Sequence, residues 1–148
     1  MLTLEHDSGT GQLARAFADA DARLKSLEQR IDQGETLPLA DTVDQAIVLV
    51  RDLITACIAE EGGKTIPEST ADLLEAFKAL VKGEPSWHAI RDNCRELVYY
   101  RNCINMDRPD ALPRVPEKMA VRTARHVYLY VRTRCVRGAG CRPERRLT

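Results

Sequence analysis

The 148-residue sequence has few aromatic residues and no apolar run long enough to cross a membrane. Aromatic residues make up only 5% of the chain, so few large side chains are available to fill a core. No stretch approaches the ~20 consecutive apolar residues that a membrane span needs. The first residues, MLTLEHDSGTGQ, show no basic start followed by an apolar run, so we expect neither a membrane anchor nor a signal peptide. A cytoplasmic protein is therefore the expectation.

Motifs for metal binding, nucleophilic catalysis and disulfide frameworks are also absent from the sequence. The five cysteines include no CxxC pair, and their odd number is a poor disulfide framework. We find no phosphate-binding glycine loop, no nucleophile elbow and no metal motif. We therefore predict no metal and no cofactor, and we favour a non-enzyme over an enzyme. The cysteines are expected to be three buried thiols and two near the C-terminal end, with a redox or metal role as the alternative: Cys57, Cys94, Cys103, Cys135 and Cys141.

The net charge of zero hides an uneven distribution along the chain. Residues 1–110 hold 12 Lys and Arg against 20 Asp and Glu, a net charge of −8. Residues 111–148 hold 10 Lys and Arg against 2 Asp and Glu, a net charge of +8. Two explanations are open: the basic end docks on the acidic body, within one chain or across a dimer, or it binds an acidic partner such as nucleic acid.

Helical periodicity dominates the first half of the sequence. One apolar stripe, with steps of four and three residues, ends at Gly34, a residue type favoured just after a helix: Leu13, Phe17, Ala20, Leu24, Leu27 and Ile31. A second stripe with the same steps predicts a helix from about Pro38 to Gly62, which we expect to be the most buried: Leu39, Val43, Ala46, Val50, Leu53 and Cys57. The two helices are suited to form a hairpin that pairs with another copy.

Three further helices are predicted, and no segment has the alternation of a strand. The third runs from about Thr70 to Lys82, with Ser69 and Asp72 resembling a capping box. The fourth begins near Pro85 and ends near Met106, before the proline-rich segment DRPDALPRVP. The fifth spans about Glu117 to Val136. We therefore predict an all-α, antiparallel bundle of about five helices in one domain, residues 1–137, with a flexible basic tail at 138–148.

Arg101 occupies an apolar position of the fourth helix. Steps of four and three residues place it in the stripe of Ile90, Cys94, Leu97 and Ile104. Because arginine keeps its charge, removing it from water without a partner would cost several kcal/mol. Three interpretations are open: an arginine that extends to solvent or pairs with an acid, an anion site, or a dimer interface. Asn105 shares its face and Asn102 flanks it, so these three residues form a candidate polar cluster.

The stretch LVYYRNCINM, residues 97–106, resembles the signature helix of HEPN domains. In that family an arginine, often followed by asparagine, precedes a histidine near the end of a helix in an all-α bundle. Arg101 and Asn102 match the Arg-Asn start, but Met106 stands where the histidine is expected. The resemblance implies dimerisation through this region. Active members are metal-independent ribonucleases and others are non-catalytic binding modules; methionine cannot exchange a proton, so the resemblance implies an inactive member.

The fifth helix has a basic arc opposite its apolar side. A nucleic-acid surface would use such cations to neutralise phosphates, whereas a solvated face would only balance acids elsewhere in the protein. The candidate phosphate-binding residues are Lys118, Arg122, Arg125 and Arg132.

From the sequence we therefore predict a non-catalytic interaction or regulatory module of degenerate HEPN type. Because aromatic side chains are scarce, we expect it to be a homodimer, and another protein is a possible partner. The alternative is a HEPN-like nucleic-acid-binding protein or ribonuclease that uses the basic C-terminal helix and tail.

Overall fold

The structure is a computed structural model, which describes the backbone of residues 2–62, 65–68 and 72–147 and the side chains of residues 11–62, 65–68 and 72–135. These residues contain helices and no strand, so the predicted all-α class is confirmed. In chain order the elements are α1 (Leu2–Asp32), α2 (Leu39–Glu61), α3 (Leu73–Val81), the 3₁₀ helix η1 (Pro85–Ile90), α4 (Arg91–Asn105), the 3₁₀ helix η2 (Pro109–Ala111) and α5 (Pro116–Leu147).

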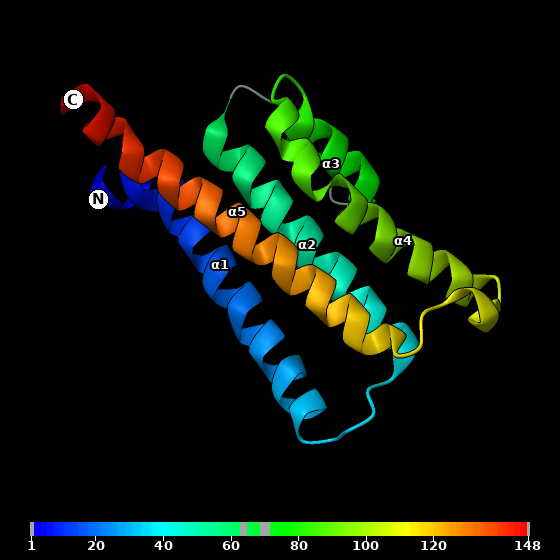
Figure 1. The fold of residues 1–148 in the computed structure, drawn as a ribbon. Coiled ribbons are helices and arrows are strands. Elements are labelled where there is room, and N and C mark those ends of the chain that lie inside the picture. The colour runs from blue at the N-terminus through cyan, green and yellow to red at the C-terminus, as the bar shows by residue number, and fades with distance from the viewer. Residues whose placement is uncertain (1, 63–64, 69–71, 148) are drawn as a thin grey trace.

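The four longer helices alternate in direction along the chain, as an antiparallel bundle requires (Figure 1). Helices α2 and α5 pack against each other over most of their lengths and form the centre of the bundle. Helix α1 lies on one side of this central pair, and α3 and α4 lie on the other. Because α4 runs between α2 and α5 in the chain, those two central helices point in the same direction (Figure 1).

The apolar stripes of α1 and α2 are buried within the chain. Leu24 and Leu27 of α1 contact the same core as Val43 and Val50 of α2. Helix α2 also buries residues on both flanks of its stripe, which fits its central position and the prediction that it is strongly buried. The two helices therefore form the predicted hairpin, but α5 covers its apolar side within the same molecule.

The first helix ends as predicted, and the third begins later than predicted. Gly34 has φ of +86°, a conformation that glycine adopts without strain, and its N–H donates to the carbonyl of Ile31 at 2.9 Å. Helix α3 starts at Leu73, because Asp72 is its N-cap: the carboxylate accepts from the N–H of Glu75, and the Glu75 carboxylate accepts from the N–H of Asp72. The predicted cap residue Ser69 lies outside the described residues.

Helix α5 is longer than predicted. Its backbone is helical from Pro116 to Leu147, past the end expected near Val136 and through Gly138, Gly140 and Pro143, the residues that favoured an earlier end. The side chains beyond Cys135 lie outside the described residues. The domain of residues 1–137 and the flexible tail of residues 138–148 therefore remain predictions. Among the helices described, none combines the length and the apolar character needed to span a bilayer.

Candidate functional site

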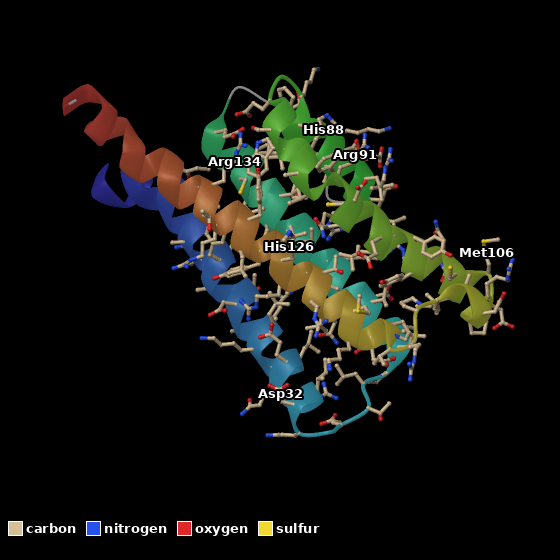
Figure 2. The ribbon with its side chains drawn as sticks, in the orientation of Figure 1. Asp32, His88, Arg91, Met106, His126 and Arg134 are labelled. Atoms are coloured by element: carbon tan, nitrogen blue, oxygen red, sulfur yellow. The ribbon has the colours of Figure 1, made fainter. Side chains whose placement is uncertain are left out.

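The polar cluster predicted around Arg101 lies at an end of α4 that projects from the bundle. In Figure 1 the last turns of α4 and the loop that follows extend past the start of α2 and α5. We call residues 98–115 the α4 tip. Met106, which stands at the position of the HEPN histidine, lies on this projection (Figure 2) and is 69% exposed. Asn102 and Asn105 are exposed as well, so the tip presents its polar groups to solvent.

Arg101 is half-buried, and the buried position expected for it is taken by other residues. Tyr100 and Cys103 are buried and continue the line of Cys94 and Leu97 in steps of three residues. Three residues turn the helix through less than a full 360°, so the buried face rotates around α4 toward its end. Tyr100, which lies outside the predicted stripe, is therefore buried, and Arg101 lies at the edge of the core.

The side chain of Arg101 makes no ion pair and no hydrogen bond to another described residue. Among the described residues, therefore, no acid of a neighbouring helix pairs with Arg101 in the way that one of the three interpretations had proposed. A half-buried arginine near a helix end can lay its apolar stem along the protein and keep its guanidinium in water. Its charge is then available to an anion or to a partner surface.

Tyr99 ties the loop of the tip back to α4. Its hydroxyl donates to the carbonyl of Ala111 at 2.9 Å, and a contact with the Cys103 thiol raises the pKa of the Tyr99 hydroxyl. Within the loop, Arg108 pairs with Asp110 at 3.2 Å. Asp107 adopts a φ of +54°, and its carboxylate makes no ion pair to the described residues. The tip thus carries two cations that make no ion pair to the described residues, Arg101 on the helix and Arg114 in the loop, and one such anion, Asp107.

A polar network between α4 and α5 supports the base of the tip. Glu96 accepts a hydrogen bond from the Thr123 hydroxyl at 3.2 Å and another from the Tyr100 hydroxyl. Burial, followed by the contact with Glu96, raises the pKa of the Tyr100 hydroxyl. Because these groups satisfy one another between the helices, they hold α4 in a fixed rotation rather than offering a free acid or base.

Arg125, one of the predicted nucleic-acid contacts, is already engaged inside the chain. Its guanidinium lies 2.8 Å from Asp21 and binds both carboxylate oxygens of Glu28 at 2.9 Å each, so it joins α5 to α1. The same guanidinium lies 5.0 Å from the ring centre of Tyr128. This supports the interpretation that the basic end neutralises the acidic body, at least at this residue.

The other three predicted contacts remain exposed. Lys118, Arg122 and Arg132 make no ion pair with another described residue. At 100° per residue they share one side of α5 with other exposed residues, among them His126 and Leu129. Figure 2 shows His126 on the stretch of α5 between α1 and α4. We call these five residues the α5 strip.

A second arginine of α5 that was not singled out in the sequence also packs within the chain. Arg134 lies 4.0 Å from the ring centre of Trp87, donates to the Ser86 hydroxyl and approaches Glu84 at 3.5 Å. Trp87 is buried, and its Nε1 has no hydrogen-bond partner among the described residues. A lone arginine in a helix gave no signal for this contact.

The thiols are placed largely as expected. Cys57, Cys94 and Cys103 are buried and Cys135 is half-buried, whereas Cys141 lies outside the described residues. The sequence did not predict that Cys57 and Cys135 meet, with their sulfur atoms 3.4 Å apart. A separation of 78 residues carries no pairing signal unless the packing of α2 on α5 is known.

Other candidate sites are poorly developed in the described residues. No three side chains of His, Cys, Asp or Glu are grouped there in a way that could hold a metal ion. A groove of about 340 Å³ runs between α1 and α2, and its lining is Arg23, Asp44, Gln45, Val48 and Leu49. Arg23 is paired with Asp19 at 3.1 Å, so the groove offers no unpaired cation to a ligand.

Comparisons with models of protein families, with curated proteins and with solved structures find no match to this chain.

Proposed function

We propose that this chain is a non-catalytic interaction module that binds a second copy of itself through the α4 tip. The observation that carries the proposal is the exposure of two large apolar side chains on this projection. Met106 is 69% exposed and Tyr99 is 49% exposed. Soluble proteins expose single apolar residues routinely, but more than one on a protruding element favours an interaction site.

The charges of the tip favour a second copy over an unrelated partner. A twofold interface places one surface against itself, so that surface must complement itself. Arg101 and Asp107 carry opposite charges with no ion pair to the described residues, so each suits the other across a twofold axis. Asn102 and Asn105 add side-chain amides that both donate and accept.

The resemblance to HEPN domains supports the same surface independently. That family typically dimerises through the region that corresponds to residues 97–106 here. The methionine at position 106 favours the non-catalytic members, because it removes the acid–base group of the ribonucleases. Reproducible turnover of RNA that is lost in Arg101→Ala would overturn the non-catalytic part of the proposal.

The dimer is tested by sedimentation equilibrium at micromolar concentration. We expect a dimer for the unaltered chain and a monomer for Met106→Glu, because a carboxylate in an apolar interface loses its hydration. Val48→Glu is the matched control, since Val48 is an exposed apolar residue on the α1–α2 hairpin. A monomeric unaltered chain would refute the proposal. Dissociation by Val48→Glu but not by Met106→Glu would move the interface to the hairpin and refute it equally.

A double-mutant cycle tests the charge pair across the axis. Arg101→Gln and Asp107→Asn each remove one charge, and asparagine tolerates the positive φ at position 107. We expect each change to weaken the dimer and the double variant to be no weaker than either single variant. Additive effects would show that Arg101 and Asp107 do not pair.

A nucleic-acid-binding function is the second candidate, and the α5 strip is the observation that favours it. Lys118, Arg122 and Arg132 are exposed along one side of α5, and Leu129 lies between them. Cations arranged along a helix in this way suit a phosphate backbone. The engagement of Arg125 with α1 makes this surface less basic than the sequence implied.

A further inference from the structure

Two thiols from distant parts of the chain meet near the end of the central helix pair. Cys57 lies in the last turns of α2, and Cys135 lies on the part of α5 that packs beside it. Their sulfur atoms are 3.4 Å apart. A disulfide has an S–S bond of about 2.05 Å, so closure requires a movement of little more than an ångström. The two parallel helices thus hold these side chains ready to bond.

We propose that Cys57 and Cys135 form a redox-sensitive pair, which a hydroperoxide converts into a disulfide that fastens α5 to α2. This is a modification site, and it is independent of the proposed dimerisation. Hydrogen peroxide is the simplest oxidant of the required chemical class.

The reaction balances in two steps. The Cys135 thiolate attacks one peroxide oxygen, the O–O bond breaks, and hydroxide leaves and takes up the proton released by the thiol, which gives a sulfenic acid and one water. The Cys57 sulfur then attacks the Cys135 sulfur, and the S–O bond breaks as the S–S bond forms. The Cys57 proton and the departing hydroxyl leave as a second water. Two thiols lose two electrons and two protons, and one hydrogen peroxide is reduced to two waters.

The surroundings of the two sulfur atoms set this order of events. Cys57 is buried, whereas Cys135 is half-buried and so is the sulfur that an oxidant reaches first. The contact with the Cys57 thiol lowers the pKa of Cys135, with Arg134 adding to the effect, while burial and the nearby Glu60 and Glu61 oppose it. Contact with Cys135, followed by burial, raises the pKa of Cys57, which therefore stays protonated until it attacks.

The other described thiols provide internal controls. Cys94 is fully buried, and burial raises its pKa to about 12. It has no thiol partner among the described residues and is expected to stay reduced. Cys103 is buried as well, and its neighbour is the Tyr99 hydroxyl instead of a second thiol. The geometry therefore predicts that peroxide oxidises the Cys57–Cys135 pair in preference to Cys94 and Cys103, and this preference can be measured.

The experiment treats the reduced full-length chain with one equivalent of hydrogen peroxide and then alkylates it in denaturant. We expect the count of free thiols to fall by two, the intact mass measured before alkylation to fall by two hydrogens, and peptide mapping to find Cys57 joined to Cys135. In Cys57→Ala the thiol count should not fall by two, and a dimedone adduct should appear on Cys135. Circular dichroism of each variant before oxidation establishes that it is folded.

Two further variants make the result decisive. Cys94→Ala and Cys141→Ser should both retain the Cys57–Cys135 disulfide and the loss of two thiols. A bond from Cys135 to Cys141, a bond between two chains, or oxidation that spreads equally over all cysteines would overturn the proposal. So would a count of free thiols that stays unchanged in the unaltered chain, because the geometry then fails to bring the sulfur atoms to bonding distance.

Discussion

Replacing Arg125 by methionine removes the guanidinium that joins α5 to α1 and keeps a long apolar side chain in its place. The guanidinium binds Glu28 through two atoms at 2.9 Å and Asp21 through a third at 2.8 Å. The Arg125 side chain is only 19% exposed, while Asp21 and Glu28 are more accessible. We expect this substitution to destabilise the bundle measurably, because two partly buried carboxylates lose their only shared cation.

The size of the effect follows from the degree of burial. Exposed ion pairs contribute about 0.2–1 kcal/mol, and breaking a fully buried pair costs about 3–5 kcal/mol. Arg125 lies between these limits and also stacks over the Tyr128 ring at 5.0 Å, a contact that contributes about 0.5–1 kcal/mol. We therefore expect a loss of about 2 kcal/mol in the free energy of unfolding, which corresponds to a fall in Tm of about 4–8 °C for a chain of this length.

Urea unfolding followed by circular dichroism measures the loss, since urea leaves the ion pairs unscreened. Arg122→Met is the matched control: Arg122 is exposed on the same helix and pairs with no described residue, so its loss should stay within about 0.5 kcal/mol. A cycle with Glu28→Gln separates the pair from the packing. If Arg125→Met and Arg122→Met unfold at the same urea concentration, the network does not stabilise the bundle and Arg125 is free for an external ligand.

Two further predictions concern the charge distribution. Hydrogen bonding to Arg125 and then to Lys25 lowers the pKa of Asp21 below its ordinary value of 3.8. The stabilisation from Asp21 is therefore complete above about pH 4 and is lost as the pH falls through the folded pKa. The free energy of unfolding of the unaltered chain should then fall more steeply below pH 4 than that of Arg125→Met. Equal slopes of this free energy against pH would contradict the prediction. On the α5 strip, we expect no sub-micromolar RNA binding in a filter-binding titration at ~150 mM salt. At this salt concentration charges are screened over about 8 Å. Binding that is weakened by Arg122→Ala and falls steeply with salt would show the opposite.

The fold was predictable because its main determinants are local. The spacing of apolar residues in α1 and α2 defines both helices, and Gly34 marks the end of the first one. The start of α3 was misplaced by about three residues because Ser69 and Asp72 are both good cap residues. Only the reciprocal hydrogen bonds of Asp72 and Glu75 identify the true cap.

The surroundings of Arg101 were not predictable from periodicity. A uniform stripe assumes that a helix buries the same face along its whole length, but α4 extends past the start of α2 and α5 (Figure 1). Its buried face therefore rotates toward Tyr100 and Cys103, and Arg101 remains at the edge. The sequence contains the arginine and its spacing, whereas the overhang of the helix is a property of the whole bundle.

The basic arc of α5 also shows which properties follow from composition and which depend on packing. The sequence reveals the opposite net charges of the two ends of the chain, but it treats Arg122 and Arg125 alike. Three residues separate them, and this rotation directs Arg125 toward the acids of α1 and Arg122 to solvent. The contact between Cys57 and Cys135 depends on packing even more strongly. Neither residue has a local sequence signal for this contact, and only the parallel packing of α2 and α5 brings them together.

The central position of α5 limits where a partner can bind. Helices α1, α2 and α4 all pack against α5, so within the described residues only one side of it, the α5 strip, faces solvent. Two other arginines of α5, Arg125 and Arg134, are held by acids of the chain itself. The strip carries unpaired cations, Lys118, Arg122 and Arg132, around one exposed apolar residue, whereas the α4 tip carries unpaired charges of both signs together with the exposed Met106 and Tyr99. A second copy needs opposite charges as well as apolar contact, and the tip offers both where the strip offers cations alone. This contrast is the physical reason for proposing the interface at the tip.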